Sequence, residues 1–235
     1  MNKPLLFGHR GCPIEYPENT LPSFAACLES SIDGIELDVQ LTKDGQLVVF
    51  HDDTLLRIAN IDEKISSLDY RTLKQIDVGD GQKIPLLDEV FSLCNEKILY
   101  DIEIKAKDMA DHQLEQKLYQ TIMKFGLSEN CIVSSFNPVS LLRFKHVCKN
   151  SMKTAVIYSI DPSVPKPLRK GFARHIVRPG YLKPEDAQAE KALTYEYPVV
   201  AWTVDTIERA EQLLTQGVRG LISNNPKLLK PLFTF

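Results

Sequence analysis

Short apolar segments alternate with longer amphipathic segments along nearly the whole chain of 235 residues. Residues 5–8 and 131–135 have the length and the apolar content of buried strands, whereas residues 20–30 and 138–148 carry apolar side chains at the spacing of a helix. A parallel pair of strands needs a crossover of about a dozen residues, and a helix usually provides it. The alternation therefore predicts an α/β fold built on a parallel sheet.

Nine segments qualify as strands. They cover residues 5–8, 32–42, 46–51, 98–105, 131–135, 154–159, 175–178, 198–204 and 220–223. The expected helices cover residues 20–30, 70–76, 86–94, 109–125, 138–148, 162–171, 184–193 and 206–216, and a short helix follows Pro226. A (β/α)8 barrel uses eight parallel strands, and a chain of this length is enough for one barrel. One of the nine strands must then lie outside the ring.

The second and third expected strands explain this surplus. Only a few residues separate them, and these include Asp44-Gly45, a pair that is typical of tight hairpin turns. The two strands must therefore be antiparallel. A two-residue turn at Asp44-Gly45 sets His51 opposite Asp38 with both side chains on one face, whereas a three-residue turn with a bulge shifts the pairing by one residue.

The domain organisation follows from the same pattern. No low-complexity linker divides the chain, and the one irregular block lies at about residues 53–85. We therefore expect a single TIM (β/α)8 barrel domain over residues 1–235, with a β-hairpin after strand 2 and a small insertion at about 53–85. Active sites of such barrels lie at the carboxyl ends of the strands, so polar residues there are the first candidates for function.

Three acidic side chains occupy such positions. Glu36 and Asp38 are two residues apart on one expected strand, so both carboxylates face the same side. Glu103 recurs in a similar alternating run near the end of another strand. Buried carboxylates need a cation or a shared proton, and three of them make an all-oxygen site suited to Mg²⁺ or Ca²⁺ rather than Zn²⁺. The alternative is that these acids face solvent on a surface strand.

Histidines and basic residues lie close to these acids in the expected fold. His9 and His51 each end an apolar run, and two imidazoles there are suited to act as acid and base on opposite sides of a phosphorus atom. A histidine at a strand end also often has only a structural role. Arg10 and Lys105 are suited to bind phosphate oxygens, and their alternative role is an ion pair with the acids.

Other distinctive side chains carry a weaker signal. Trp202, the only tryptophan, lies in a late expected strand, where it either walls a small-molecule pocket at the rim or packs between helices and sheet. His112 and His146 lie in polar helix patterns, so we expect them at the surface. His175 opens a short expected strand, and we assign it a structural role.

Charge, hydropathy and cysteine content exclude several classes of function. The formal net charge is −3 and no basic run occurs, so electrostatic binding of nucleic acid has no support. No stretch of about 18 apolar residues occurs, so we expect no membrane span. The five cysteines are scattered without a CxxC pair, which favours free thiols. Because the first residues also lack a signal-peptide pattern, we expect a cytoplasmic protein. The oligomeric state does not follow from the sequence.

Several motifs, taken together, resemble those of the glycerophosphodiester phosphodiesterases. They are Gly8-His9-Arg10-Gly11, Pro17-Glu18-Asn19-Thr20, Gly34-Ile35-Glu36-Leu37-Asp38-Val39, Thr42-Lys43-Asp44-Gly45, His51-Asp52, Glu103-Ile104-Lys105, Ser135-Phe136 and Trp202-Thr203-Val204. The resemblance covers nearly the whole chain and is strongest in its first quarter. The combined pattern is specific to this family, whereas no single motif is.

The resemblance implies a TIM-type barrel that hydrolyses glycerophosphodiesters, as small-molecule substrates, to sn-glycerol 3-phosphate and an alcohol. It implies a divalent cation, Mg²⁺ or Ca²⁺, and an insertion after His51 that covers the mouth of the barrel. The site residues that it implies are Glu36, Asp38 and Glu103 for the metal, His9 and His51 as the acid–base pair, Arg10 and Lys105 for the phosphate, and Trp202 for the glycerol pocket.

Two positions depart from the family pattern. The chain has Ser223-Asn224-Asn225-Pro226 where the family often has Thr-Asp-x-Pro, and Asp205 where the family often has Asn after Trp-Thr-Val. Neither position belongs to the metal or acid–base set. The departures therefore concern the geometry of the rim and the choice of substrate more than the reaction.

Three other functions stay open from the sequence. The first is a lysophospholipase D-type activity, with an apolar groove supplied by residues 58–87. The second is metal-dependent sugar-phosphate isomerisation on the same barrel, and the third is a non-catalytic barrel that binds phosphodiesters. The sequence also leaves open which histidine is the base and whether water or the glycerol 2-hydroxyl is the nucleophile.

Overall fold

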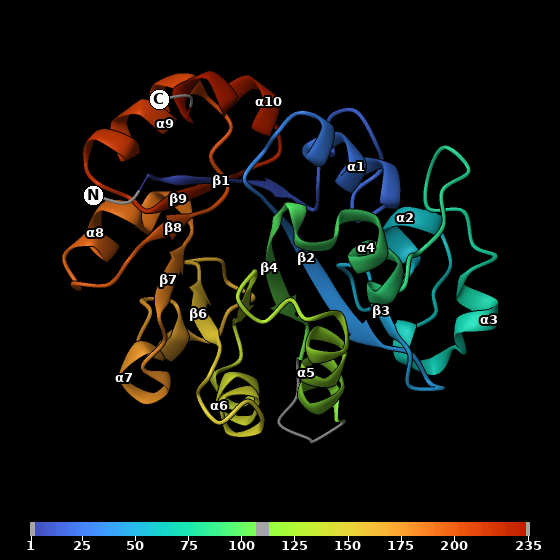
Figure 1. Ribbon diagram of the computed structural model, residues 1–235. Helices are drawn as coiled ribbons and strands as arrows, with labels where there is room; N and C mark the ends of the chain where they lie inside the picture. Colours follow the sequence, from blue (N-terminus) through green and yellow to red (C-terminus); the bar gives the residue numbers. More distant parts are fainter. Residues whose placement is uncertain (1–2, 107–112, 234–235) are drawn as a thin grey trace.

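The computed structural model describes residues 3–106 and 113–233. Within these residues, eight parallel strands form a ring in the order β7-β6-β5-β4-β2-β1-β9-β8 (Figure 1). Their bounds are β1 Leu5–His9, β2 Gly34–Leu41, β4 Leu99–Ile104, β5 Cys131–Ser135, β6 Lys153–Tyr158, β7 Tyr181–Pro184, β8 Val200–Ala201 and β9 Gly220–Ser223. Parallel bridges from Leu182 to Val199 and from Glu185 to Trp202 connect β7 to β8 and complete the ring. The prediction of a TIM (β/α)8 barrel is confirmed.

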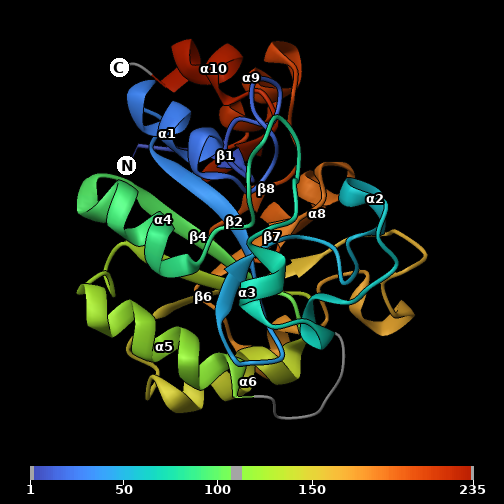
Figure 2. The same ribbon diagram turned by 90° about the vertical axis from the view of Figure 1, so that its right-hand side faces the viewer.

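Helices connect the strands and cover the outside of the barrel (Figures 1 and 2). They are α1 Leu21–Glu29, α2 Leu56–Ala59, α3 Tyr70–Leu73, α4 Leu87–Cys94, α5 Leu114–Phe125, α6 Pro138–Val147, α7 Arg174–Val177, α8 Ala189–Leu193, α9 Ile207–Thr215 and α10 Pro226–Leu229. Short 3₁₀ turns lie at Ile65–Ser67, Asn95–Lys97, Lys166–Leu168, Asp186–Gln188 and Lys230–Phe233. In the part of the chain that the structure describes, no helix is long and apolar enough to span a membrane.

Local sequence signals set the ends of several helices. At the start of α6, the Asn137 side chain accepts a hydrogen bond from the Val139 N–H at 3.0 Å, and Pro138 occupies the first turn. Gly126 ends α5 in the left-handed conformation, with φ of 71°. The expected helix at residues 109–125 begins outside the described residues, so its predicted start has no structural counterpart here.

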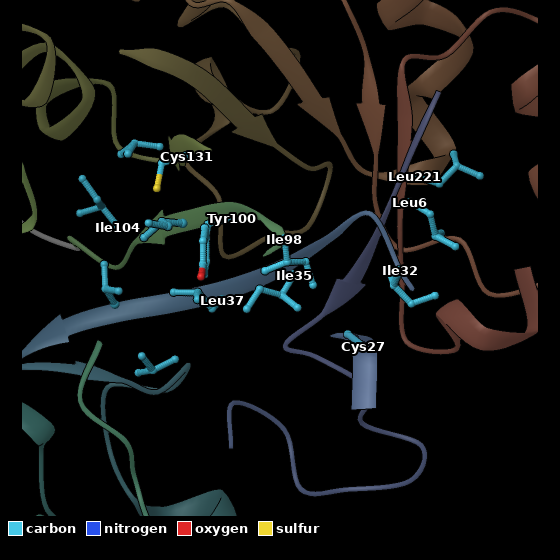
Figure 3. Packing of buried hydrophobic residues seen from close by; sticks show 14 of the residues in the cluster. Leu6, Cys27, Ile32, Ile35, Leu37, Ile98, Tyr100, Ile104, Cys131 and Leu221 are labelled. Atoms are coloured by element: carbon cyan, nitrogen blue, oxygen red, sulfur yellow. The ribbon is translucent and has the colours of Figure 1, made fainter. Parts of the chain in front are cut away.

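Side chains on β2 alternate between two layers of the core. Ile35 and Leu37 face the helices and belong to the large cluster between helices and barrel (Figure 3). Phe7, on the neighbouring strand, belongs to a separate cluster inside the barrel. Because successive strand residues point to opposite faces, Glu36 and Asp38 lie on the inner side, where both are buried. The same alternation that stabilises the barrel therefore carries two carboxylates into it.

The hairpin has the expected antiparallel pairing but a different register. β3 (Leu47–Val49) pairs with β2, and the turn holds residues 43–45, with Gly45 at φ of 74°. This is a three-residue turn with a left-handed glycine. The prediction that His51 lies opposite Asp38 is wrong, because the extra turn residue shifts the pairing by one. The Phe50 N–H instead donates to the Asp38 carbonyl at 2.9 Å.

The strand predicted at residues 175–178 is also wrong. This segment forms α7, and the strand is β7, which begins six residues after His175. Ile176-Val177 favours a strand by propensity, but the tertiary context overrides such a preference. β7 itself has a weak apolar pattern, because Lys183 is buried inside the barrel and Pro184 ends the strand.

Two helices predicted in the same region are shorter than expected. Residues 162–171 contain only the 3₁₀ turn Lys166–Leu168, because three prolines in this stretch lack the N–H group that a longer helix requires. The helix predicted at residues 184–193 begins only at Ala189, after the 3₁₀ turn Asp186–Gln188. The loops on this side of the barrel are therefore longer and less regular than predicted.

Residues 53–85 pack beside the hairpin as a small unit. Leu55, Ile65, Leu73 and Ile84 form a buried cluster with Val48 of β3, separate from the main core. The helix predicted near Tyr70 is present as α3, and Figure 2 shows α3 beside β2. Through Val48, this cluster packs the unit against the barrel. The loops at the edge of the unit can therefore place polar groups near the strand ends.

Candidate active site

Candidate functional side chains gather where β1, β2 and β4 end. The parallel register places His9 level with Glu36, and Asp38 level with Glu103. Lys105 follows β4 directly. Residues that are level on adjacent strands share a face of the sheet, so these side chains meet at the inner, carboxyl-terminal edge of the barrel.

A tight turn after β1 sets the direction of Arg10. Arg10 and Gly11 both have positive φ, of 57° and 90°. A Cβ atom on Gly11 would lie 2.3 Å from Ser23 Oγ, so the turn requires glycine both for its conformation and for the close approach of α1. This backbone directs the Arg10 N–H toward Glu36 Oε2, at 3.1 Å.

The three acids form a compact, buried cluster. Glu36, Asp38 and Glu103 each offer a carboxylate oxygen, and these atoms lie within 4.8 Å of one another. Asp38 Oδ1 is buried and has no hydrogen-bond partner among the described residues. Burial, together with the charge of Asp38, raises the pKa of Glu36 well above its usual range. A set of carboxylate oxygens, of which one accepts no hydrogen bond and one belongs to an acid whose charged form is disfavoured by burial, fits a hard divalent cation.

Two basic side chains lie against this cluster. Lys105 Nζ is 2.8 Å from Glu103 Oε1 and 3.5 Å from Asp38 Oδ1, and Arg10 Nε is 3.6 Å from Asp38 Oδ2. The Asn19 amide donates to Asp38 Oδ2 at 2.8 Å. Burial opposes ionisation of Asp38, but Lys105 and the other nearby cationic groups hold its pKa below the usual range. Arg10 and Lys105 therefore form the ion pairs considered from the sequence, and both side chains also line the cavity.

His9 is held by an amide group. Its Nδ1 lies 2.7 Å from Asn224 Oδ1, and its Nε2 lies 4.0 Å from Glu36 Oε2. Asn224 is fixed in turn by Asp205, which accepts hydrogen bonds from the Asn224 backbone N–H at 2.7 Å and from its side chain at 2.8 Å. Burial and the charge of Arg10 lower the pKa of His9 to about 4. The two positions that departed from the family pattern thus contact each other and support His9.

His51 is held by a carboxylate group. Its Nδ1 lies 2.6 Å from Asp52 Oδ1, and Asp52 Oδ2 accepts from Arg57 Nε at 2.5 Å. Arg57 belongs to α2 and therefore to the block at residues 53–85. Although the predicted pairing with Asp38 fails, the chain leaves β3 so that His51 still lines the cavity.

Sequence reasoning missed an ion pair on the floor of the site. Lys183 Nζ lies 2.8 Å from Asp101 Oδ2 and 3.1 Å from Ser134 Oγ, and both charged side chains are almost fully buried. Burial opposes the charge of Lys183, but Asp101 and Glu36 raise its pKa. Asp101 stood in the alternating run that contains Glu103, which was the available signal. Lys183 had none, because its strand was predicted elsewhere.

One cavity of about 930 Å³ joins these groups. Its charged side consists of His9, Arg10, Glu36, His51, Glu103, Lys105 and Lys183, with Asp38 buried beneath them. Its other side is mainly apolar and includes Phe136, Pro138, Val139, Val164, Pro165, Leu168 and Trp202. The seven predicted site residues on the cavity wall and Asp38 thus lie around one space, although the sequence separates them by up to 193 positions, from His9 to Trp202.

Trp202 stands at the boundary between the charged floor and the apolar side. Its indole Nε1 donates to the Lys183 carbonyl at 2.9 Å, and its ring meets Phe136 edge-on at 5.7 Å between centroids. It packs with the cluster inside the barrel, so the alternative position between helices and sheet is wrong. An aromatic wall in this place suits the carbon skeleton of a small ligand.

The other histidines of the described residues, His146 and His175, do not line this cavity. His146 is exposed on α6, in keeping with its predicted surface position. His175 is also exposed, and its ring contacts Phe172 at 5.6 Å between centroids. His112 lies outside the described residues.

Comparison with known proteins identifies the family of this barrel. A model of the Glycerophosphoryl diester phosphodiesterase family matches residues 9–228. The Glycerophosphodiester phosphodiesterase of Caldanaerobacter subterraneus subsp. tengcongensis is 34% identical over 235 residues, which cover 97% of this chain and 96% of that protein. A protein of the same description from Bacillus altitudinis is 33% identical, with 94% of each chain covered.

Solved structures show the same architecture. The glycerophosphodiester phosphodiesterase of Thermotoga maritima is 25% identical, with a TM-score of 0.76 and 99% of each chain covered. A phosphodiesterase of Oleispira antarctica, solved in complex with the product sn-glycerol-3-phosphate, is 23% identical, with a TM-score of 0.79 over 97% of this chain and 96% of that chain. This chain is therefore a barrel enzyme of the phosphodiesterase class. It belongs to the glycerophosphoryl diester phosphodiesterase family, as its motifs predicted.

Proposed function

We propose that this chain hydrolyses glycerophosphodiesters to sn-glycerol 3-phosphate and an alcohol, with a divalent cation and with acid–base catalysis by two histidines. The observation that carries the proposal is the meeting of three buried carboxylates with His9 and His51 around one cavity. The relatives named as glycerophosphodiester phosphodiesterases support the choice of substrate. The product in the Oleispira antarctica complex supports the choice of product.

In this proposal, Glu36, Asp38 and Glu103 hold a hard cation, Mg²⁺ or Ca²⁺. A cation bound there would supply Lewis-acid polarisation and neutralise part of the phosphate charge. The Asp38 oxygen that accepts no hydrogen bond and the raised pKa of Glu36 support a cation in this place. Arg10 and Lys105 bind the non-bridging phosphate oxygens, whose charge increases in the transition state.

The surroundings of the two histidines support a proposed division of roles. His9 has a pKa of about 4, lowered by burial and by Arg10, so it is uncharged near neutral pH. We assign it as the base that takes a proton from the attacking oxygen of water or of the glycerol 2-hydroxyl. His51 Nδ1 contacts the Asp52 carboxylate at 2.6 Å, which holds the ring in place and leaves Nε2 for proton exchange. We assign it as the acid that protonates the leaving alkoxide.

The apolar side of the cavity supports a second substrate class, the lysophospholipids, as in the lysophospholipase D-type activity. Val139, Val164 and Leu168 line the cavity beyond the charged groups. Val139 belongs to the first turn of α6, and Val164 and Leu168 belong to the segment after β6, whereas residues 58–87 were the source considered from the sequence. Part of the cavity surface can therefore contact an apolar chain on the leaving alcohol.

Release of glycerol 3-phosphate from glycerophosphocholine tests the proposed function. We expect turnover with Mg²⁺ or Ca²⁺, loss of turnover after chelation, and recovery when either ion is restored. The same assay with lysophosphatidylcholine separates the two substrate classes. Full activity of the chelated protein would contradict the ligand assignment, and absence of turnover on every glycerophosphodiester with either ion would contradict the proposed reaction.

We also propose that residues 1–235 work as one domain, with residues 53–85 as an insertion at the mouth. The cluster around Leu55 and Ile65 and the contact of Arg57 with Asp52 support this organisation. All five cysteines are free thiols, which supports a reducing, cytoplasmic setting. Limited proteolysis tests the organisation, since a single cooperative domain resists cleavage outside its exposed loops.

A further inference from the structure

One arginine connects the supports of two candidate active-site residues. Arg57, on α2, donates from Nε to Asp52 Oδ2 at 2.5 Å, and Asp52 contacts His51. The same guanidinium donates to Glu18 from both terminal nitrogens, from Nη2 to Oε1 at 2.7 Å and from Nη1 to Oε2 at 3.1 Å. Glu18 Oε1 also accepts a hydrogen bond from Arg10 Nη1 at 2.9 Å. A continuous series of charged contacts therefore runs from His51 to Arg10.

This series differs from an ordinary surface ion pair. Isolated exposed pairs contribute little to stability, whereas bidentate geometry within a network of several charges fixes position. The Arg57 side chain is 48% exposed, but Asp52 and Glu18 are 23% and 22% exposed. A planar guanidinium can satisfy two carboxylates at once, which the single ammonium of lysine does less well. The arrangement therefore fixes geometry more than it adds stability.

We propose that Arg57 is a positioning residue for the reaction. It holds Asp52 against His51 Nδ1 and Glu18 against Arg10, so that the proton-transferring ring and the phosphate-binding guanidinium keep a set spacing across the mouth of the barrel. The contact of Nδ1 with Asp52 leaves His51 Nε2 as the atom that exchanges the proton with substrate. This inference rests on the proposed function for its chemistry. It gives the inserted block a role in catalysis through α2, without contact between that helix and the substrate.

Loss of Arg57 should act on His51 first. Without the guanidinium, the Asp52 carboxylate is free to turn toward solvent and the imidazole is free to rotate and exchange tautomers. Glu18 would then keep Arg10 as its remaining partner in this series. A displacement of about 1 Å in a catalytic group can lower a rate by about 10²-fold. We therefore expect kcat of Arg57→Gln to fall by about 10- to 10²-fold.

The experiment compares Arg57→Gln with Arg71→Gln, a substitution of an exposed arginine on α3 of the same block. Turnover of glycerophosphocholine is measured with Mg²⁺, together with the melting temperature. Arg57→Gln should lose kcat while its melting temperature stays within a few degrees of the wild type, and Arg71→Gln should match the wild type in both. A kcat of Arg57→Gln within twofold of the wild type would overturn the proposal.

A second measurement does not depend on turnover. In ¹⁵N-labelled protein with Mg²⁺ in alkaline buffer, the His51 ring nitrogens report which nitrogen carries the proton. We expect one tautomer, protonated at Nδ1, in the wild type and in Arg71→Gln, and a mixture in Arg57→Gln. Unchanged His51 signals in Arg57→Gln would overturn the positioning role. Because this readout needs no substrate, failure of the proposed reaction and failure of this inference are distinguishable.

A double-mutant comparison separates the Asp52 contact from a general effect of charge. Arg57→Gln and Asp52→Asn are measured singly and together. If Arg57 acts through Asp52, the double variant should lose about as much kcat as the more impaired single variant. Multiplication of the two separate losses would show that the residues act independently and would contradict the proposed path. Arg57→Lys should recover only part of the loss, because one ammonium cannot reproduce both contacts.

Discussion

The two sides of the cavity differ in chemistry and in the precision that each demands. The side formed at the ends of β1, β2 and β4 carries groups such as His9, Glu36 and Lys105. The other side includes Val139, at the start of α6, and Leu168, in the segment after β6. Buried charges must be matched with partners, so each one restricts its neighbours. Replacing one apolar side chain with another of similar volume has a small effect on stability. We infer that the charged side determines the reaction and the apolar side determines which alcohol is accepted.

The largest effect is expected from the acidic cluster on the charged side. Asp38→Asn removes a ligand charge from the centre of the cluster, and loss of metal assistance is equivalent to several kcal/mol of transition-state stabilisation. We expect turnover of glycerophosphocholine to fall by about 10⁴-fold or more. Calorimetric titration with Mg²⁺ or Ca²⁺ should show weaker binding in parallel. Asp62→Asn, a substitution of an exposed acid, is the matched control. Turnover of Asp38→Asn near the wild-type value would show that the acidic cluster is not required for the reaction.

The two histidines come next in expected effect. Removing a proton-transferring group typically lowers a rate by about 10²- to 10⁴-fold, so we expect losses of this size in His9→Ala and His51→Ala. The exposed His146→Ala variant should keep the wild-type rate. The pH dependence of kcat separates the roles, since loss of the base and loss of the acid remove different limbs of the profile. Either histidine whose variant keeps wild-type turnover has no place in the mechanism.

The charged side was also the part that sequence could predict. Glu36 and Asp38 share a face because a strand repeats every two residues, and this requires no knowledge of tertiary structure. His9 and Lys105 end clear apolar runs, so the barrel topology alone brings them to one edge. The position of His51 was predicted on the wrong register, yet it reached the site, because the hairpin returns to the same strand ends.

The parts that sequence could not predict depend on distant packing. Lys183 is buried on a strand whose pattern is weak, and its contacts with Asp101 and Ser134 account for its place inside the barrel. Asp205 and Asn224 appeared as departures from a pattern, and their mutual hydrogen bonds were invisible without the fold. Residues 58–87 were considered as the source of an apolar groove, whereas several of the apolar residues that line the cavity follow β5 and β6. An apolar residue in an irregular segment carries no periodicity that fixes its direction.

The buried setting of His9 predicts an acid-dependent loss of stability. Its pKa in the folded protein is about 4, below the usual value of about 6.5, so between these values the unfolded chain binds more protons. The contribution of His9 to the free energy of unfolding is therefore complete above about pH 6.5. It decreases by about 3 kcal/mol as the pH falls toward 4.

Urea unfolding of the chelated protein from pH 7 to pH 4.5 measures this effect. The wild type should lose about 2 to 3 kcal/mol more than His9→Gln over that interval, because glutamine does not titrate. The exposed His146→Gln variant should follow the wild type. Parallel curves for wild type and His9→Gln would show that His9 is less enclosed by the charged side than the structure indicates.

The smallest effect is expected on the apolar side. Leu168→Ala removes part of the wall, and a change of this size in an apolar pocket alters discrimination between substrates by about tenfold. The test is kcat/KM for glycerophosphodiesters whose leaving alcohols carry alkyl chains of increasing length, with Leu142→Ala, on the exposed face of α6, as the control. The wild type should favour longer chains, and Leu168→Ala should lose part of that preference while the shortest ester changes least. If kcat/KM of the wild type did not depend on chain length, the alcohol would leave toward solvent. The two sides of the cavity would then differ in burial and not in substrate choice.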